Sequence, residues 1–160
     1  MTTQKEDLAF GLSSEDKLLQ TLDGVFGTRL SKSSYYSPMD FHNSSKTLYV
    51  ELKTRRIAHD RYSTALIGLN KTHFCSDPEK KYYFVYCYTD GMYYIEYNKE
   101  LFDTFDVDYE YVRGDRSDCI NYSSSVVHIP ISQLKKIDGV MGVTKPQTIS
   151  VANSSASPSA

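Results

Sequence analysis

The feature that most constrains the fold is a pair of aromatic-rich runs on either side of the tripeptide Thr89-Asp90-Gly91. The first run covers residues 81–88 and the second covers residues 92–97. Both are rich in Tyr, Phe, Val and Ile, which are residues that favour strands. Asp-Gly between two such runs is a strong signal for a tight turn. The sequence therefore predicts an antiparallel hairpin over residues 81–97.

The remaining elements follow from hydrophobic periodicity and from turn residues. Leu12, Leu19, Leu22 and Phe26 recur at helical spacing, which predicts a helix between Ser13 and Phe26 that ends at Gly24 or Gly27. The other predicted elements are strands at 28–41 and 46–55 joined by a polar turn at 42–45, a short helical stretch at 62–71, strands at 109–113 and 126–131, and a helical turn at 132–137.

Length and composition predict one domain. The chain has 160 residues, of which 40% are apolar and 24% charged, so it is long enough to bury a core without disulfides or metal staples. We expect this domain to cover residues 1–138. Residues 139–160 are rich in Gly, Thr, Pro, Ser and Ala and lack periodicity, which predicts a disordered tail.

Neither a membrane segment nor a secretion signal is evident. No run of about 18 apolar residues exists, and the polar segment Met1-Thr2-Thr3-Gln4-Lys5-Glu6-Asp7 lacks the apolar core of a signal peptide. We therefore expect an intracellular protein, in the cytoplasm or nucleus, that is not secreted. Three widely spaced cysteines, none in a C-x-x-C pair, argue against a disulfide framework and a structural zinc site.

Residues 47–53 alternate as a strand does. Leu48, Val50 and Leu52 fall on one side, which we expect to face the core. Glu51 and Lys53 fall on the other side, roughly 7 Å apart along the strand at about 3.4 Å per residue. Asp40, at the end of a Pro-Met-Asp turn, precedes them by the length of a hairpin.

Glu15 lies on the apolar stripe of the predicted first helix, three residues after Leu12 and four before Leu19. A carboxylate there is costly unless it meets a cation, a metal or good donors. In one interpretation the helix begins at Ser14, and Glu15 favours its positive N-terminal end. In the other, Glu15 points to the same site as Asp40.

A local basic segment is hidden by the net charge of −2. Residues 53–71 hold several cations and a single acid, Asp60. The cations beyond Lys53 are Arg55, Arg56, Arg61 and Lys71. Such a segment is either a solvated face or a contact for phosphates. Fourteen tyrosines are a second signal, for which packing in the predicted hairpin is favoured over stacking on bases.

The sequence "PMD" at Pro38 to Asp40, followed after ten residues by "ELK" at Glu51 to Lys53 and preceded by a helix with a glutamate, resembles the PD-(D/E)XK nuclease superfamily. The resemblance covers roughly residues 13–97. It implies an α/β (α+β) restriction-endonuclease-like core, α-β-β-β-α-β, with a mixed central sheet flanked by helices.

The resemblance also implies roles for individual residues. Asp40 and Glu51 would hold Mg²⁺, with Mn²⁺ as a substitute, and the Leu52 carbonyl would be a further ligand. Lys53 would be the catalytic lysine, and Glu15 would match the first-helix carboxylate of many members. Hard Mg²⁺ prefers carboxylate oxygens, and hydrolysis needs an activated water and a cation for the developing charge. The basic segment would then contact phosphates.

The function that follows is a metal-dependent endonuclease acting on nucleic acid, with DNA favoured over RNA and a homodimer compatible with the resemblance. The alternative is a catalytically idle member of the fold that binds nucleic acid or protein; the intact Asp40, Glu51 and Lys53 disfavour it. A third interpretation, an unrelated α+β interaction module, predicts Asp40 and Glu51 on separate surfaces.

Overall fold

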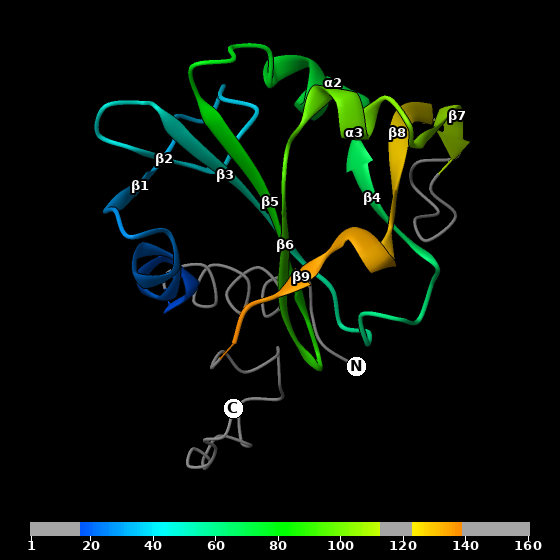
Figure 1. Cartoon of the computed structure of the whole chain (residues 1–160), viewed down its shortest axis with the longest axis horizontal. Coiled ribbons are helices and arrows are strands. Elements are labelled where there is room, and N and C mark those ends of the chain that lie inside the picture. Colours follow the sequence, from blue (N-terminus) through cyan, green and yellow to red (C-terminus); the bar gives the residue numbers. More distant parts are fainter. Residues whose placement is uncertain (1–16, 113–122, 139–160) are drawn as a thin grey trace.

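The computed structural model of the protein describes residues 17–112 and 123–138 (Figure 1). Its main sheet has six strands in the order β1-β2-β3-β5-β6-β9. These strands are β1 (Leu30–Lys32), β2 (Phe41–Asn43), β3 (Leu48–Thr54), β5 (Lys81–Tyr88), β6 (Gly91–Glu96) and β9 (Lys135–Lys136). β3 and β5 are parallel, and the other neighbours are antiparallel, so the sheet is mixed as predicted.

A second, antiparallel sheet has three strands in the order β4-β8-β7. They are β4 (Thr64–Gly68), β8 (Ser123–Pro130) and β7 (Asp106–Val112). Short helices connect the sheets: α2 (Leu69–Phe74), α3 (Lys99–Phe102) and the 3-10 turn η2 (Ile131–Gln133). In Figure 1 this second sheet lies on the opposite side of β5 and β6 from the first helix, which covers residues 17–26.

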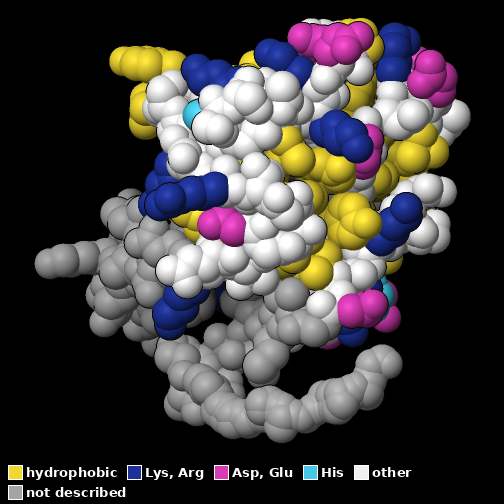
Figure 2. Space-filling view, turned by 60° about the vertical axis from the view of Figure 1, so that its left-hand side comes forward, with side chains coloured by type: hydrophobic (Ala, Val, Ile, Leu, Met, Phe, Trp, Pro, Cys, Tyr) yellow, Lys and Arg dark blue, Asp and Glu magenta, His cyan; other side chains and the backbone are white. Residues whose placement is uncertain are grey.

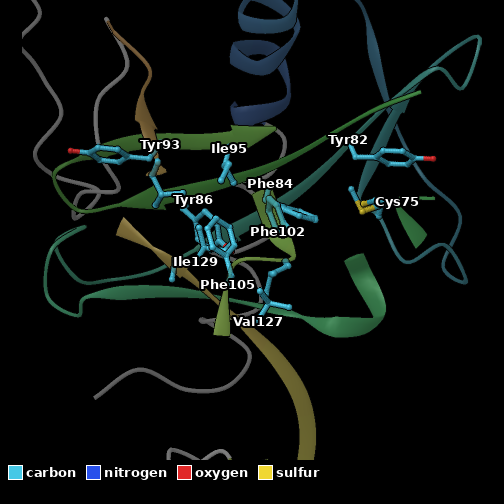
Figure 3. Close-up of a cluster of buried hydrophobic side chains, with 14 of the residues drawn as sticks. Cys75, Tyr82, Phe84, Tyr86, Tyr93, Ile95, Phe102, Phe105, Val127 and Ile129 are labelled. Carbon is cyan, nitrogen blue, oxygen red and sulfur yellow. The ribbon is translucent and has the colours of Figure 1, made fainter. Parts of the chain in front are cut away.

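Two hydrophobic clusters hold these layers together. Between the two sheets, Phe84, Tyr86 and Phe102 pack with Val127 and Ile129 (Figure 3). On the other face of the main sheet, a second cluster joins the first helix to β2, β3, β5 and β6. Its members include Leu22, Phe41, Val50, Leu52, Val85 and Met92. The main sheet is therefore covered on both faces.

The chain order of the core confirms the α-β-β-β-α-β arrangement. The helix over 17–26 is followed by β1, β2 and β3, then by α2 and the parallel strand β5. β4 is inserted between β3 and α2, within the crossover that parallel pairing requires. Gly27, at φ 64°, follows the first helix and favours its end there, because glycine adopts this conformation without strain.

Several predicted elements agree with the structure and others do not. The predicted strand over 28–41 is the short strand β1 and a loop, β2 includes part of the predicted turn at 42–45, and the predicted helical turn at 132–137 contains β9. The hairpin is present as β5 and β6, and the strands near the C-terminus appear as β7 and β8. The predicted helix over 62–71 is wrong in its first half, because Thr64–Gly68 is a strand that pairs with β8. Helix α2 begins only at Leu69. The predicted tail at 139–160 lies outside the described residues.

The covering of both faces also corrects the expectation for β3. Leu48, Val50 and Leu52 do face one cluster, as predicted. The opposite side is not simply a solvent face, since Tyr49 packs between the sheets and Glu51 is only 2% exposed. Among the described residues, no helix is long and apolar enough to cross a membrane.

Candidate active site

Asp40 lies where the pairing of β2 with β3 ends. Phe41 pairs with Val50 and His42 with Tyr49, so the register continued by one residue sets Asp40 opposite Glu51. The side chain of Asp40 turns onto β3, where its Oδ2 accepts a hydrogen bond of 2.8 Å from the backbone N–H of Leu52. The two carboxylates predicted to share one site are therefore neighbours across the end of this ladder.

The Glu51 carboxylate is buried among cationic groups. Its Oε1 lies 3.0 Å from Nζ of Lys53 and 3.1 Å from Nζ of Lys71. Its Oε2 is buried, and no described residue donates a hydrogen bond to it. A buried carboxylate oxygen without a donor is costly, and such groups occur where a ligand or ion completes the site.

Burial raises the pKa of Glu51 above its ordinary value, and the nearby negative charge of Asp40 raises it as well. Lys53 and Lys71 act in the opposite direction, but each of their effects is smaller than that of desolvation. A divalent cation beside Glu51 and Asp40 would reverse this balance by favouring both ionised carboxylates. Two acidic groups of this kind fit a hard cation that prefers oxygen ligands.

The backbone of Leu52 faces the same region. Because the N–H and C=O of one residue in an extended strand point to the same neighbour, the bond from Leu52 N–H to Asp40 directs the Leu52 carbonyl toward the Asp40 side of β3. This is the side on which β2 has already ended. This geometry fits the Leu52 carbonyl as the predicted third oxygen ligand.

The structure places Lys71 beside Glu51, whereas the basic segment of the sequence suggested a contact with phosphates. It lies on α2, and its Nζ donates to the Pro38 carbonyl as well as contacting Glu51. It thus links the helix to Glu51 and to the Pro38-Met39-Asp40 turn. We missed this role in the sequence because the contact depends on how the crossover folds back over β3.

Neutral side chains form the buried surroundings of Glu51. Cys75 Sγ contacts the Lys71 carbonyl at 3.2 Å, and burial raises the pKa of this thiol to about 12, with the Glu51 charge adding to the effect. Tyr86 is completely buried and donates to the Leu66 carbonyl at 2.9 Å. Both donors are directed at backbone oxygens, so they leave the Glu51 Oε2 without a partner.

The three arginines predicted to bind nucleic acid are exposed and lie after β3. Arg55 donates to the Thr54 carbonyl at 3.2 Å, and the Arg61 guanidinium lies 5.3 Å from the centre of the Tyr62 ring. Arg56 is also exposed. On the face in Figure 2, Lys and Arg side chains occupy separate positions around a band of hydrophobic surface. Glu15, the fourth predicted site residue, lies outside the described residues.

A second group of potential metal ligands lies at the β5–β6 turn. The ligand atoms of His59, Asp60 and Asp90 are within 4.8 Å of one another. The His59 ring nitrogen Nδ1 is 2.5 Å from Asp90 Oδ2, and its backbone N–H donates to Asp90 Oδ1 at 2.9 Å. The His59 ring stacks on Tyr93 with centroids 4.5 Å apart. These contacts already satisfy Asp90 and fix the segment after β3 to the hairpin.

A hollow of about 710 Å³ lies between the first helix and the strands β5, β6 and β9. Its lining includes Phe26, Tyr83, Tyr94 and Lys136. Neither Asp40 nor Glu51 borders it. We place the candidate chemistry at Glu51 because the buried carboxylate oxygen and the two ammonium groups are there, whereas the described lining of the hollow holds a single carboxylate, that of Asp138.

An α-β-β-β-α-β core that brings Asp, Glu and Lys together at the end of the second and third strands defines the PD-(D/E)XK class of nuclease folds. The family model described as "Phage putative PDDEXK endonuclease" matches residues 2–137, and the chain belongs to this family. Comparison with curated proteins gave no match. The family implies a nucleic-acid substrate, and PD-(D/E)XK nucleases generally depend on a divalent metal.

Proposed function

We propose that the chain is an endonuclease that hydrolyses phosphodiester bonds in DNA with Mg²⁺, for which Mn²⁺ can substitute. The observation that carries the proposal is the Glu51 carboxylate, with one oxygen held by two lysines and the other buried and without a donor among the described residues. The family supports nuclease chemistry, and the choice of DNA over RNA rests on the superfamily resemblance alone.

Asp40, Glu51 and the Leu52 carbonyl would hold the cation. When bound, Mg²⁺ polarises a phosphoryl oxygen and lowers the pKa of the attacking water. Asp40 is fixed for this task by the Leu52 N–H, which occupies Oδ2 and leaves its other oxygen for a ligand. Glu51 is fixed by its two lysines, which occupy Oε1 and leave Oε2.

Lys53 is the residue best placed to act on the substrate. Its side chain is 28% exposed, so a phosphate can approach the ammonium group while the group stays near Glu51. A cation at this position orients the attacking water and stabilises negative charge that develops on the phosphoryl oxygens. Arg55, Arg56 and Arg61, which follow on the same chain segment, would hold neighbouring phosphates through charge.

Lys71 acts through Glu51. Its ammonium lowers the pKa of Glu51 and contacts the Pro38 carbonyl two residues before Asp40. We therefore assign Lys71 as a positioning residue that keeps Glu51 ionised and aligned. Loss of a group that orients a metal ligand typically costs about 10–100-fold in metal affinity or activity.

The decisive experiment incubates the full chain with Mg²⁺ or Mn²⁺ and single-stranded, duplex, flap and four-way DNA, together with matching RNA. We expect cleavage of DNA, and a Lys53→Ala variant that loses about 10²–10³-fold in turnover while still binding substrate in Ca²⁺. Lys99→Ala, which alters an exposed lysine on α3 that pairs with Asp103, is the matched control. No cleavage of any substrate, or full cleavage by Lys53→Ala, would overturn the proposal.

A Lys71→Met variant tests the positioning role in the same assay. We expect a loss of about tenfold or more at neutral pH that becomes smaller as the pH rises, because Glu51 then ionises without help from Lys71. Lys53→Ala should keep most of its loss at high pH, because it removes the group that acts on the phosphate as well as a charge that lowers the pKa of Glu51. A pH-independent loss in Lys71→Met would assign Lys71 to substrate contact instead.

A further inference from the structure

Two tyrosines stand out from the protein surface on the loop that carries Asp40. Tyr35 is 94% exposed and Tyr36 is 91% exposed, more than any other large hydrophobic side chain among the described residues. Their rings contact each other edge to face, with centroids 5.4 Å apart. Most tyrosines of the hairpin are instead buried or half-buried, including Tyr82, Tyr86, Tyr88 and Tyr93.

The loop holds this pair at the tip of a turn. The Ser37 N–H donates to the Ser34 carbonyl at 3.0 Å, so Tyr35 and Tyr36 occupy the two central positions of a four-residue turn. Gly, Pro, Asn, Asp and Ser dominate such turns because they suit the backbone. Tyrosine offers the turn no such advantage, and at this exposure the rings stabilise little within the chain.

The same loop is anchored to the candidate active site. The Ser33 N–H donates to the Asp40 carbonyl at 2.8 Å, which closes the base of the loop, and the Pro38 carbonyl accepts from Lys71. Tyr36 is four residues from Asp40, so their backbones are at most about 14 Å apart. Along one strand of a duplex this distance corresponds to about four nucleotides at 3.4 Å each.

We propose that Tyr35 and Tyr36 form a stacking site for an unpaired nucleobase of the substrate, within a few nucleotides of the phosphate that is cut. The inference rests on the proposed nuclease function and narrows it, because a base inside a regular duplex is already stacked and cannot cover these rings. The substrates favoured by such a site contain a single strand, a flap or a branch near the cut. Aromatic side chains stack on all four bases, so the site adds preference for unpaired structure without sequence specificity.

The test uses the full chain in Ca²⁺, which supports binding and little cleavage. Three variants are compared with the wild type. The double variant Tyr35→Leu/Tyr36→Leu removes both rings, and the double variant Tyr35→Phe/Tyr36→Phe keeps them. The third variant, Tyr109→Leu, removes the ring of a tyrosine on β7 that is 69% exposed. The probes are a single strand, a forked duplex and a fully paired duplex of one sequence, with 2-aminopurine at successive unpaired positions.

We expect the Leu double variant to bind the single strand and the fork about tenfold or more weakly and the paired duplex within twofold of the wild type. The Phe double variant and Tyr109→Leu should bind all three probes as the wild type does. Wild-type protein should quench 2-aminopurine at one or two positions, and the Leu variant should not. An equal loss on paired and unpaired probes, or no loss, would overturn the inference.

Cleavage and sedimentation of the same variants distinguish base stacking from contact between copies of the chain. If wild-type protein cleaves DNA in Mg²⁺ and the Leu double variant binds every probe as tightly as the wild type does, the nuclease proposal stands and the stacking site is wrong. If sedimentation shows a wild-type dimer that the Leu variant dissociates, the pair is a contact between copies of the chain, and the inference is also wrong. Failure of the wild type to bind any nucleic acid would remove both proposals.

Discussion

Glu51 and Asp90 both lie beside groups that can carry positive charge, but burial sets them apart. Glu51 is 2% exposed, its pKa is raised, and one of its oxygens has no donor among the described residues. Burial alone would raise the pKa of Asp90 too, but the side chain of Asp90 is 38% exposed, and its hydrogen bonds from His59 hold its pKa below the ordinary value.

The comparison distinguishes Glu51, which has an oxygen that a ligand could bind, from Asp90, whose two oxygens already have hydrogen-bond partners. Both oxygens of Asp90 accept hydrogen bonds from His59, so this pair stabilises a connection between the segment after β3 and the hairpin. Two lysines contact Oε1 of Glu51, but its Oε2 has no hydrogen-bond donor among the described residues. A cluster of potential ligand atoms is therefore a weaker indication of a metal site than a buried oxygen left without a partner.

The largest effect that we expect from this difference is on metal binding and cleavage. The double variant Asp40→Asn/Glu51→Gln keeps side-chain size and removes two negative ligands, so Mn²⁺ binding by titration calorimetry should disappear and cleavage should fall by about 10³-fold or more. Asp90→Asn is the control and should retain both within about twofold. Metal binding that follows Asp90 instead would move the metal centre to the hairpin turn.

A smaller effect concerns stability without metal. Because the folded protein raises the pKa of Glu51, ionisation of Glu51 opposes folding, and this cost appears as the pH rises above the ordinary value of 4.5. Glu51→Gln keeps an acceptor for Lys53 and Lys71 but removes the buried charge. We expect it to raise the melting temperature by a few degrees at pH 8, with the gain decreasing toward pH 4.5.

Thermal melts of wild type and Glu51→Gln from pH 4.5 to pH 8, in chelator, measure this effect. Adding Mn²⁺ should stabilise the wild type and leave the variant unchanged, since a ligand that binds only the folded state raises its stability. A variant that melts below the wild type throughout this pH range would show that the two lysines need the full negative charge of Glu51.

The smallest effect is expected at the hairpin turn. The folded-state pKa of Asp90 is lowered, so its contribution to stability is present above its unfolded pKa and disappears as the pH falls through the folded value. Because this pair is exposed, Asp90→Asn should cost no more than about 1 kcal/mol at pH 7. Urea unfolding at pH 7 and at pH 3 measures the difference, which should be smaller at the lower pH; a larger loss at pH 3 would contradict this account.

Local signals in the sequence were enough for the elements that form between near neighbours. The β5–β6 hairpin follows from Asp90-Gly91 and its flanking aromatic runs, and the first helix ends where Gly27 permits it. The segment Thr64–Gly68 could not be assigned in the same way. Its Ala and Leu suit a helix, but it pairs with β8 about 60 residues later, and such partners leave no local signal.

The same distinction between local and long-range contacts applies to the residues of the candidate site. Asp40 directly precedes β2, and a short turn joins β2 to the strand that holds Glu51 and Lys53, so a spacing motif was sufficient to group them. Lys71 belongs to the same constellation only because α2 folds back across β3, and the basic composition of its segment suggested a phosphate contact instead. The exposure of Tyr35 and Tyr36 likewise could not be predicted from the sequence, because it depends on which of the tyrosines pack in the core.

The parallel pairing of β3 with β5 has a consequence for how the protein folds. Its partners, from Leu48 with Lys81 to Thr54 with Cys87, are 33 residues apart in sequence, and no hairpin can bring them together. Closing this crossover is slower than forming the β5–β6 hairpin, because the loss of chain entropy precedes the contacts that offset it. Lys71 lies inside the crossover, so its contact with Glu51 forms with this late step. A partly folded chain with an open crossover therefore holds Asp40 and Glu51 without Lys71, and the proposed site is complete only when β3 pairs with β5.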